Sequence, residues 1–286
     1  MYADFDYDVG ILKKYTDDCY KLTYMRACRK EGIAVELNKE RCTDPDAPKS
    51  AASISRTRAK IKELAICNDW EHFVTLTIDK TKHDRYDLDR YKKKLSKWIN
   101  NYNERQGTAI RYLLIPEEHK DGAWHIHGLL AGIPQEHLQE FTLDCNITAR
   151  MRRMIRRGKR LLNWPSYAGN FGFVSMELIR NSERAATYIA KYVEKQALKN
   201  RIGRYDNMYY CSQGLKRCEV VYKDNLYFDF VSDYKSKDGA VKVRYFTNID
   251  EPMKLFNGVF DIPVSSEWFS EIVDDDVGDN PFLECA

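Results

Sequence analysis

The sequence predicts an α+β fold in which helices pack on a central antiparallel sheet, and two observations carry this prediction. Short runs of β-branched and aromatic residues alternate with longer stretches whose apolar residues recur at helical spacing. Two of the short runs are separated only by Glu118–Gly122, which ends in an Asp-Gly pair typical of hairpin turns. Strands joined by so short a turn are antiparallel, because parallel neighbours need a long crossover.

The individual elements follow from these patterns in chain order. In residues 53–67 and 87–105 the apolar side chains fall on one helical face, and Asn181 and Ser182 can cap a third helix. We expect helices over 53–67, 87–105 and 182–199, and strands over 72–79, 109–117, 124–132 and 171–179. Strand-like runs follow at 218–224, 226–232 and 240–246.

Charge is distributed unevenly along the 286 residues. The whole chain carries a formal +3, but residues 250–286 hold ten acidic residues against one basic, or −9, which leaves +12 for residues 1–249. A basic body of this kind favours a polyanionic partner, most often nucleic acid. We expect an N-terminal helical extension over 1–70, a main domain over 71–200, a strand-rich continuation of that domain over 201–249 and an acidic tail over 250–286.

The sequence shows no sign of export or membrane insertion. No apolar run approaches the roughly 18 residues of a membrane span, and the N-terminus lacks the pattern of a secretory signal. The eight cysteines form no CxxC pair and are too sparse for a disulfide framework. We therefore expect a cytoplasmic protein with reduced thiols and no membrane partner.

A His-x-His pattern is the first feature that carries chemistry. His125 and His127 lie in a predicted strand, so both imidazoles point to one side while Ile126 faces the other. The hairpin turn brings Glu117, at the end of the preceding strand, back beside them. Two imidazoles and a carboxylate suit a divalent transition metal, or Mg²⁺ or Mn²⁺ where water and phosphate oxygens complete the shell. The alternative is an ordinary strand with two hydrogen-bonded histidines on a polar face.

A pair of tyrosines is the second such feature. Tyr188 and Tyr192 lie one turn apart in the last predicted helix, and Lys195 continues the same face. Ile189 and Val193 form a separate apolar stripe, by which the helix can dock while the tyrosines line a cleft. Tyrosines in this arrangement can equally be core residues with tethered hydroxyls.

Together, the two features favour phosphodiester chemistry. A phenol is a weak nucleophile at neutral pH because its pKa is about 10. It becomes effective when a metal ion polarises a phosphate and neutralises the developing charge. A site of this kind would cut one DNA strand, form a 5′-phosphotyrosine bond, release a 3′-OH and keep the bond energy for rejoining.

Three blocks of the sequence resemble motifs of the HUH-superfamily rolling-circle replication initiators. They are Phe73–Asp79, Glu117–His127 and Tyr188–Lys195, and the likeness is greatest to the gene A replication proteins of microvirus-like phages and related plasmid or prophage initiators. The resemblance implies an HUH endonuclease-like fold and a metal-dependent, sequence-specific nickase of single-stranded origin DNA in a bacterial host cell. Since the chain has no GxxxxGK[ST] phosphate loop, we expect a host helicase and polymerase as partners.

The resemblance also implies roles for individual residues. Two tyrosines match the family's paired nucleophiles, two lysines would stabilise phosphate charge, and a carboxylate with two histidines matches the ligands of Mg²⁺ or Mn²⁺. In that order, the residues are Tyr188 and Tyr192, Lys191 and Lys195, and Glu117, His125 and His127. Glu118 matches no binding position, and the lysines can equally be solvated. Because both lysines lie near Tyr192, we expect Tyr192 to nick first.

A basic segment, Ala149–Arg160, holds seven cations and no acidic residue. We expect it to track a DNA backbone, although a run of charges is often only a solvated face. Its candidate DNA-binding residues are Arg150, Arg152, Arg153, Arg156, Arg157, Lys159 and Arg160. Two other functions stay open: a transposase or mobilisation relaxase of the same superfamily, and a non-enzymatic DNA-binding protein whose His-x-His pair is structural.

Overall fold

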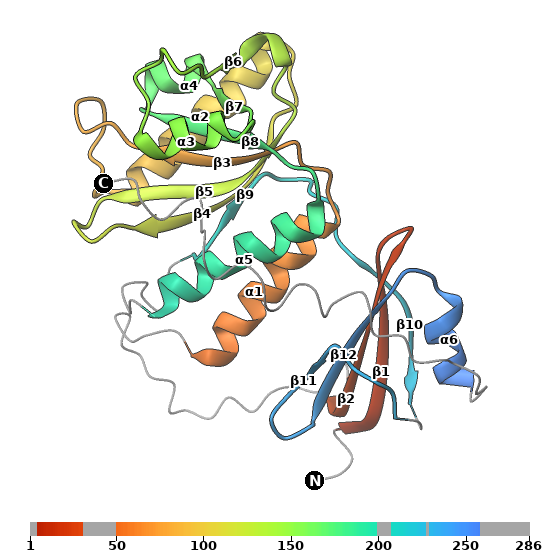
Figure 1. Ribbon diagram of the computed structural model, residues 1–286. Coiled ribbons are helices and arrows are strands. Elements are labelled where there is room, and N and C mark those ends of the chain that lie inside the picture. The colour runs from red at the N-terminus through yellow and green to blue at the C-terminus, as the bar shows by residue number, and fades with distance from the viewer. Residues whose placement is uncertain (1–4, 31–49, 199–206, 227–228, 258–286) are drawn as a thin grey trace. The chain divides into compact units, whose positions relative to one another are not determined.

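The computed structural model describes residues 5–30, 50–198, 207–226 and 229–257. Its contacts divide the chain into two compact units: a central unit of residues 42–216 with 284–286, and a terminal unit of residues 1–41 with 217–283. Each unit is an antiparallel sheet with helices packed on it, which confirms the predicted α+β class (Figure 1).

The central unit is built on a sheet with the strand order β6-β7-β8-β3-β5-β4-β9. These strands are β3 (His72–Thr77), β4 (Arg111–Glu118), β5 (Trp124–Ala131), β6 (Gln139–Glu140), β7 (Leu161–Asn163), β8 (Val174–Leu178) and β9 (Tyr210–Cys211). β4 and β5 form the predicted antiparallel hairpin, and Gly122 takes a positive φ of 83° in its turn. The strand expected over 72–79 pairs with both β5 and β8, so it lies in the middle of the sheet.

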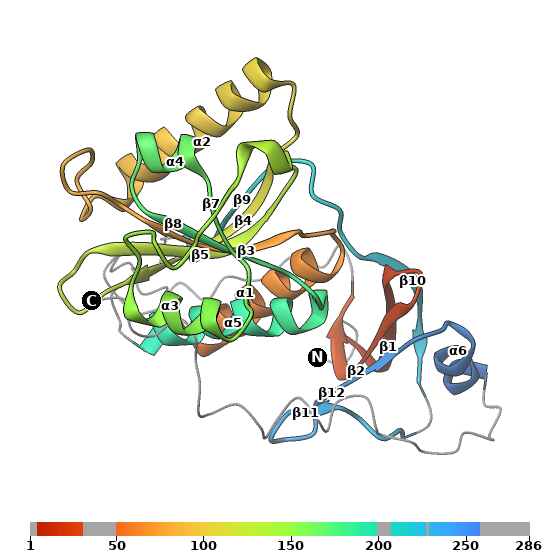
Figure 2. The same cartoon turned by 45° about the horizontal axis from the view of Figure 1, so that its top comes forward.

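Helices cover both faces of this sheet. They are α1 (Ala51–Ile66), α2 (Leu88–Gln106), α3 (Ala149–Arg156), α4 (Pro165–Asn170) and α5 (Ser182–Leu198), with a 3-10 turn at Gln135–His137. α1 and α5 pack against each other on one side, and α2 lies on the other (Figure 2). Among the described residues, no helix is long and apolar enough to cross a membrane.

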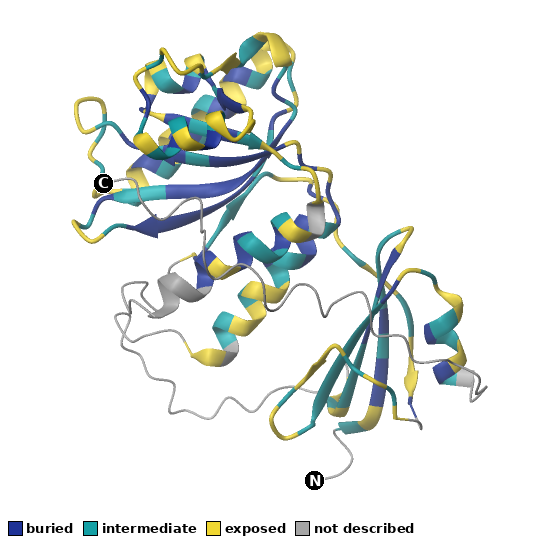
Figure 3. Ribbon diagram, in the orientation of Figure 1, coloured by how far each residue is buried: buried dark blue, intermediate teal, exposed yellow. Residues whose placement is uncertain are grey.

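The alternation of side chains along the strands gives the two faces different chemistry. Leu76 and Ile126 point towards α2 and are buried against Tyr91, Leu95 and Ile99 in the main hydrophobic core. The dark blue stretches of β3, β4 and β5 in Figure 3 include this core. The neighbouring odd-numbered residues of the same strands point to the opposite face, where α5 lies. Since the core occupies one face, the other is available for polar side chains.

The terminal unit is a second antiparallel sheet, with the strand order β10-β1-β2-β12-β11. Its elements are β1 (Phe5–Thr16), β2 (Cys19–Arg29), β10 (Glu219–Asn225), β11 (Tyr234–Lys235), β12 (Val241–Phe246) and α6 (Asp250–Asn257). The apolar residues Leu12, Leu22, Leu226, Phe246 and Leu255 form its core. Gly10 makes room for this packing, because a Cβ atom there would lie only 2.4 Å from Leu226.

The division of the chain differs from the expected one. Residues 5–29 form two long strands rather than a helical extension, and the outer edges of this hairpin pair with β10 and β12. Two parts of the chain that were expected to belong to different regions therefore share one sheet, a pairing that linear order does not reveal. No strand is assigned to the described residues of 226–232, and β11 follows at Tyr234. The expected acidic tail begins as α6, and its remainder, 258–286, lies outside the described residues.

Candidate active site

Three neighbouring strands bring polar side chains to the α5 face of the central sheet. In the antiparallel register, His125 is paired with Glu117 on one side and with Thr77 on the other, and His127 is paired with Thr75. Because these residues are opposite one another in adjacent strands, their side chains share one face. The predicted juxtaposition of Glu117 with the two histidines is therefore present, and the register assigns Glu118 to the other face.

His127 and Glu117 form a buried pair. The Nε2 atom of His127 lies 2.7 Å from an Oε2 atom of Glu117, and the two side chains are only 3% and 6% exposed. On the other side of the ring, Thr75 Oγ1 lies 3.2 Å from Nδ1. A hydroxyl can donate or accept, so Thr75 can hold either tautomer of the imidazole.

His125 is positioned in a similar way but in a more open setting. Its Nδ1 atom lies 3.4 Å from Thr77 Oγ1, and its ring stacks on that of His119 with the centroids 4.0 Å apart. Burial lowers the pKa of His125 from its ordinary 6.5 to about 4, and the neighbouring His119 and His127 act in the same direction. His125 is therefore neutral near pH 7, the state in which an imidazole can bind a metal ion.

The donor chemistry of this face fits a divalent cation. Both Nδ1 atoms face threonines, which leaves the Nε2 atoms of His125 and His127 for another ligand, and a carboxylate already lies at one of them. Within the described ranges, however, no three His, Cys, Asp or Glu side chains are arranged so as to hold a metal ion. Metal binding thus stays a prediction, and it requires the hydrogen bond between Glu117 and His127 to open.

Helix α5 carries the two tyrosines over this face. The fully buried Ile189 and Val193 dock the helix, as the apolar stripe in the sequence predicted. The ring of Tyr192 stacks on that of His127 with centroids 4.2 Å apart, and the ring of Phe73 contacts that of Tyr188 edge-on at 5.2 Å. The two tyrosine hydroxyls lie 3.0 Å from each other. Docking therefore places both hydroxyls together beside the histidine pair.

The two phenols differ in exposure and in pKa. Tyr192 is 6% exposed, whereas Tyr188 is half-buried. Burial raises the pKa of Tyr188 to about 12, and burial together with the adjacent Tyr188 raises the pKa of Tyr192. The charge of Arg150 acts in the opposite direction on both pKa values.

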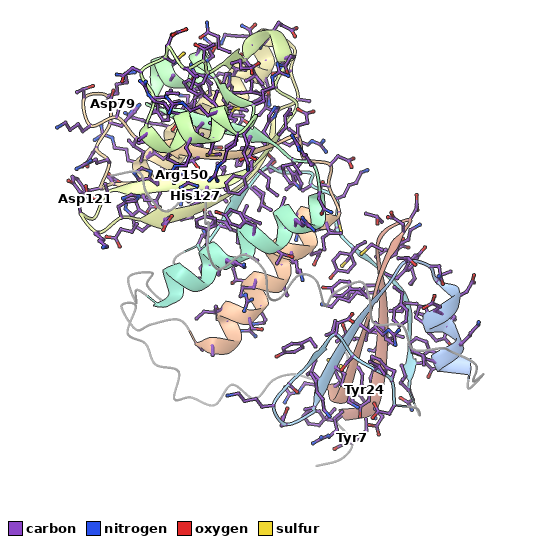
Figure 4. The ribbon with its side chains drawn as sticks, in the orientation of Figure 1. Tyr7, Tyr24, Asp79, Asp121, His127 and Arg150 are labelled. Atoms are coloured by element: carbon purple, nitrogen blue, oxygen red, sulfur yellow. The ribbon has the colours of Figure 1, made fainter. Side chains whose placement is uncertain are left out.

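The predicted basic residues are distributed over several settings. Arg150, at the start of α3, lies near the tyrosines, and in Figure 4 it is seen close to His127. Arg152 donates to backbone carbonyls, and Lys159 and Arg160 form ion pairs with Glu177 and Glu140. Exposed positions are occupied by Arg153, Arg156 and Arg157. The segment is thus a helix that brings one arginine to the site, rather than a uniform basic surface.

The two predicted lysines contribute less to the described geometry. Lys191 is exposed, while the side chain of Lys195 lies outside the described residues, although its backbone belongs to α5. Four residues that contact the site had no role in the prediction: Phe73, Thr75, Thr77 and His119. The alternation of Phe73, Thr75 and Thr77 along one strand was visible in the sequence, but its partner strand was not.

Fold and site together define an α+β protein with a histidine–carboxylate sheet face covered by a helix that carries two tyrosines. Residues 71–197 match the family model of the Replication-associated protein of ORF2 and phage gene II type. This region, which runs from β3 to α5 and contains the whole candidate site, is therefore a member of that family of replication proteins, and the family implies interaction with DNA. No curated protein matches the chain. No solved structure matches it either.

Proposed function

We propose that this protein initiates rolling-circle replication as a metal-dependent endonuclease that nicks and rejoins one DNA strand at an origin through a tyrosine nucleophile. One observation carries the proposal: two tyrosine hydroxyls 3.0 Å apart lie beside a buried histidine–glutamate pair. Core tyrosines need only one partner each, whereas this pair is assembled on the face that also holds the candidate ligands. Membership of a replication-associated family supports the same assignment.

In the proposed reaction, the hydroxyl oxygen of one tyrosine attacks the scissile phosphorus. A P–O bond to tyrosine forms, the P–O3′ bond breaks, and the 3′ oxygen takes up a proton to become the 3′-OH primer. The neighbouring tyrosine hydroxyl can accept the proton's hydrogen bond as the phenol ionises, and the Arg150 guanidinium offsets negative charge near both oxygens. The second tyrosine then remains for a second strand transfer, which reverses the same bond exchange.

His125, His127 and Glu117 would hold the divalent cation in this proposal, with Mg²⁺ and Mn²⁺ as candidates. Such an ion, when bound, supplies a Lewis acid that polarises the phosphate. Thr75 and Thr77 orient the two rings for this role, and the low pKa of His125 keeps its ring neutral.

The test is covalent capture of DNA. The full chain is incubated with single-stranded DNA from its own replicon and Mn²⁺, and the adduct is mapped by peptide sequencing. The proposal expects a 5′-phosphotyrosine on Tyr188 or Tyr192 and no adduct with the double variant Tyr188→Phe/Tyr192→Phe. An adduct on another tyrosine would refute the assigned nucleophiles, and DNA retention without cleavage would identify a binding protein. A transposase or relaxase would instead cut at a transposon end or a transfer origin.

A further inference from the structure

A second polar feature lies on the other side of the central sheet, away from α5. It is a hollow of about 870 Å³ between the exposed side of α2 and the edge strand β9. This volume falls in the range of natural ligand sites, which is roughly 300–1,000 Å³. The hollow lies entirely within the central unit, and none of the candidate catalytic or metal residues lines it.

The helix wall of the hollow is basic and polar. Lys92, Lys93 and Lys97 contribute three cations, against one carboxylate from Glu104. Lys93 and Lys97 are exposed and one turn apart, so their ammonium groups repeat along the helix as charges do along a phosphate backbone. The remaining helix residues on this wall are Ser96, Asn100 and Asn101, which add hydroxyl and amide groups. A wall of this composition suits a polyanion that also presents hydrogen-bonding groups.

The strand wall is aromatic. Tyr112 of β4 and the consecutive Tyr209 and Tyr210 line it. The Lys92 ammonium lies 4.1 Å from the centre of the Tyr210 ring, so one cation and one aromatic face already form a joint surface. Tyr209 and Tyr210 are only partly buried. Aromatic faces next to lysines form the usual surface for unpaired bases and their phosphates.

We propose that this hollow binds a segment of single-stranded DNA, with Lys93 and Lys97 at its phosphates and the tyrosine wall at its bases. This inference rests on the proposed function, which provides the single strand. A duplex presents phosphates but keeps its bases stacked inside, so it would use only the helix wall. The aromatic wall therefore favours the single strand over the duplex.

Two double variants on the same helix test the proposal. Lys93→Glu/Lys97→Glu reverses two charges inside the hollow, and Arg90→Glu/Lys94→Glu reverses two exposed charges on α2 outside it. Affinity for a short labelled single-stranded oligonucleotide is measured by fluorescence anisotropy across a salt series, with the matching duplex in parallel. Removing two single-strand phosphate contacts lowers the slope of log affinity against log salt by about 1.4, and reduces affinity about tenfold or more at moderate salt.

The expected result is that the hollow variant loses affinity and slope for the single strand, while the matched control stays near the wild type. Equal losses in both variants, or no loss in either, would overturn the proposal, because the lysines would then act only through the overall charge. A duplex that loses as much as the single strand would overturn the role of the bases. Covalent adduct formation by the wild type reports on the nicking proposal separately, so either proposal can fail while the other stands.

Discussion

The two tyrosines are not equivalent, so their single Tyr→Phe variants should behave differently. Burial raises the pKa of Tyr188 from its ordinary 10 to about 12, which corresponds to about 3 kcal/mol and about a hundredfold less phenolate at a given pH. The pKa of Tyr192 is raised further, and its ring is held flat against His127. In this conformation Tyr188 is the more accessible nucleophile, contrary to the expectation, based on the neighbouring lysines, that Tyr192 nicks first.

Tyr188→Phe should therefore slow the first nicking step by about tenfold or more, whereas Tyr192→Phe should leave most of it. Each change removes the same hydroxyl–hydroxyl hydrogen bond, with an equal loss of about 1 kcal/mol, so the difference between the variants isolates the nucleophile. The assay follows adduct formation on an origin oligonucleotide over time and identifies the modified peptide. A wild-type adduct found first on Tyr192, with full speed in Tyr188→Phe, would refute this reasoning.

Three further outcomes follow from the site. Glu117→Ala should weaken the Mn²⁺ dependence of nicking more than Glu118→Ala, because only Glu117 contacts His127; the reverse order in a metal titration would contradict the register. Arg150→Gln should reduce adduct formation roughly tenfold or more, and the exposed Arg153→Gln should not, as measured by initial rates. Because the unfolded state binds a proton at His125 near pH 6.5 and the folded state only near pH 4, stability should fall by up to roughly 3 kcal/mol as the pH drops through that range. Urea unfolding of His125→Gln should lack this part of the pH dependence.

The sequence was sufficient to predict the central part of the fold, because local signals agree there. Gly122 in a positive-φ turn and the alternation of His125 and Ile126 across a strand are local features, and both are present in the structure. The bounds of α2 follow in the same way, since Asp87 caps its start and Gly107 ends it with a φ of 62°. Each of these features is decided within a few residues, so no knowledge of distant contacts was needed.

Features that depend on distant pairing were not predictable in this way. The strand Phe5–Thr16 has neighbours more than 200 residues away in sequence, because Leu12 is paired with Tyr222. Likewise, Thr75 contacts His127 only because β3 lies next to β5, an adjacency that no local pattern states. The position of Arg150 beside the tyrosines depends on how α3 packs, whereas its charge alone suggested only DNA binding.

The edge strand β9 connects the two proposals physically. Tyr209 and Tyr210 both line the hollow, yet Tyr209 is also influenced by Glu63 of α1, the helix that packs with α5, while Tyr210 has Lys92 of α2 over its ring. Consecutive residues of an extended chain turn to opposite sides, so this pair of rings spans the edge of the sheet. A single strand that occupies both the hollow and the tyrosine site has to pass round this edge, since the core fills the sheet between them. The edge strand would then guide the DNA from the basic helix wall to the scissile phosphate, a role that follows from alternation and needs no change in either site.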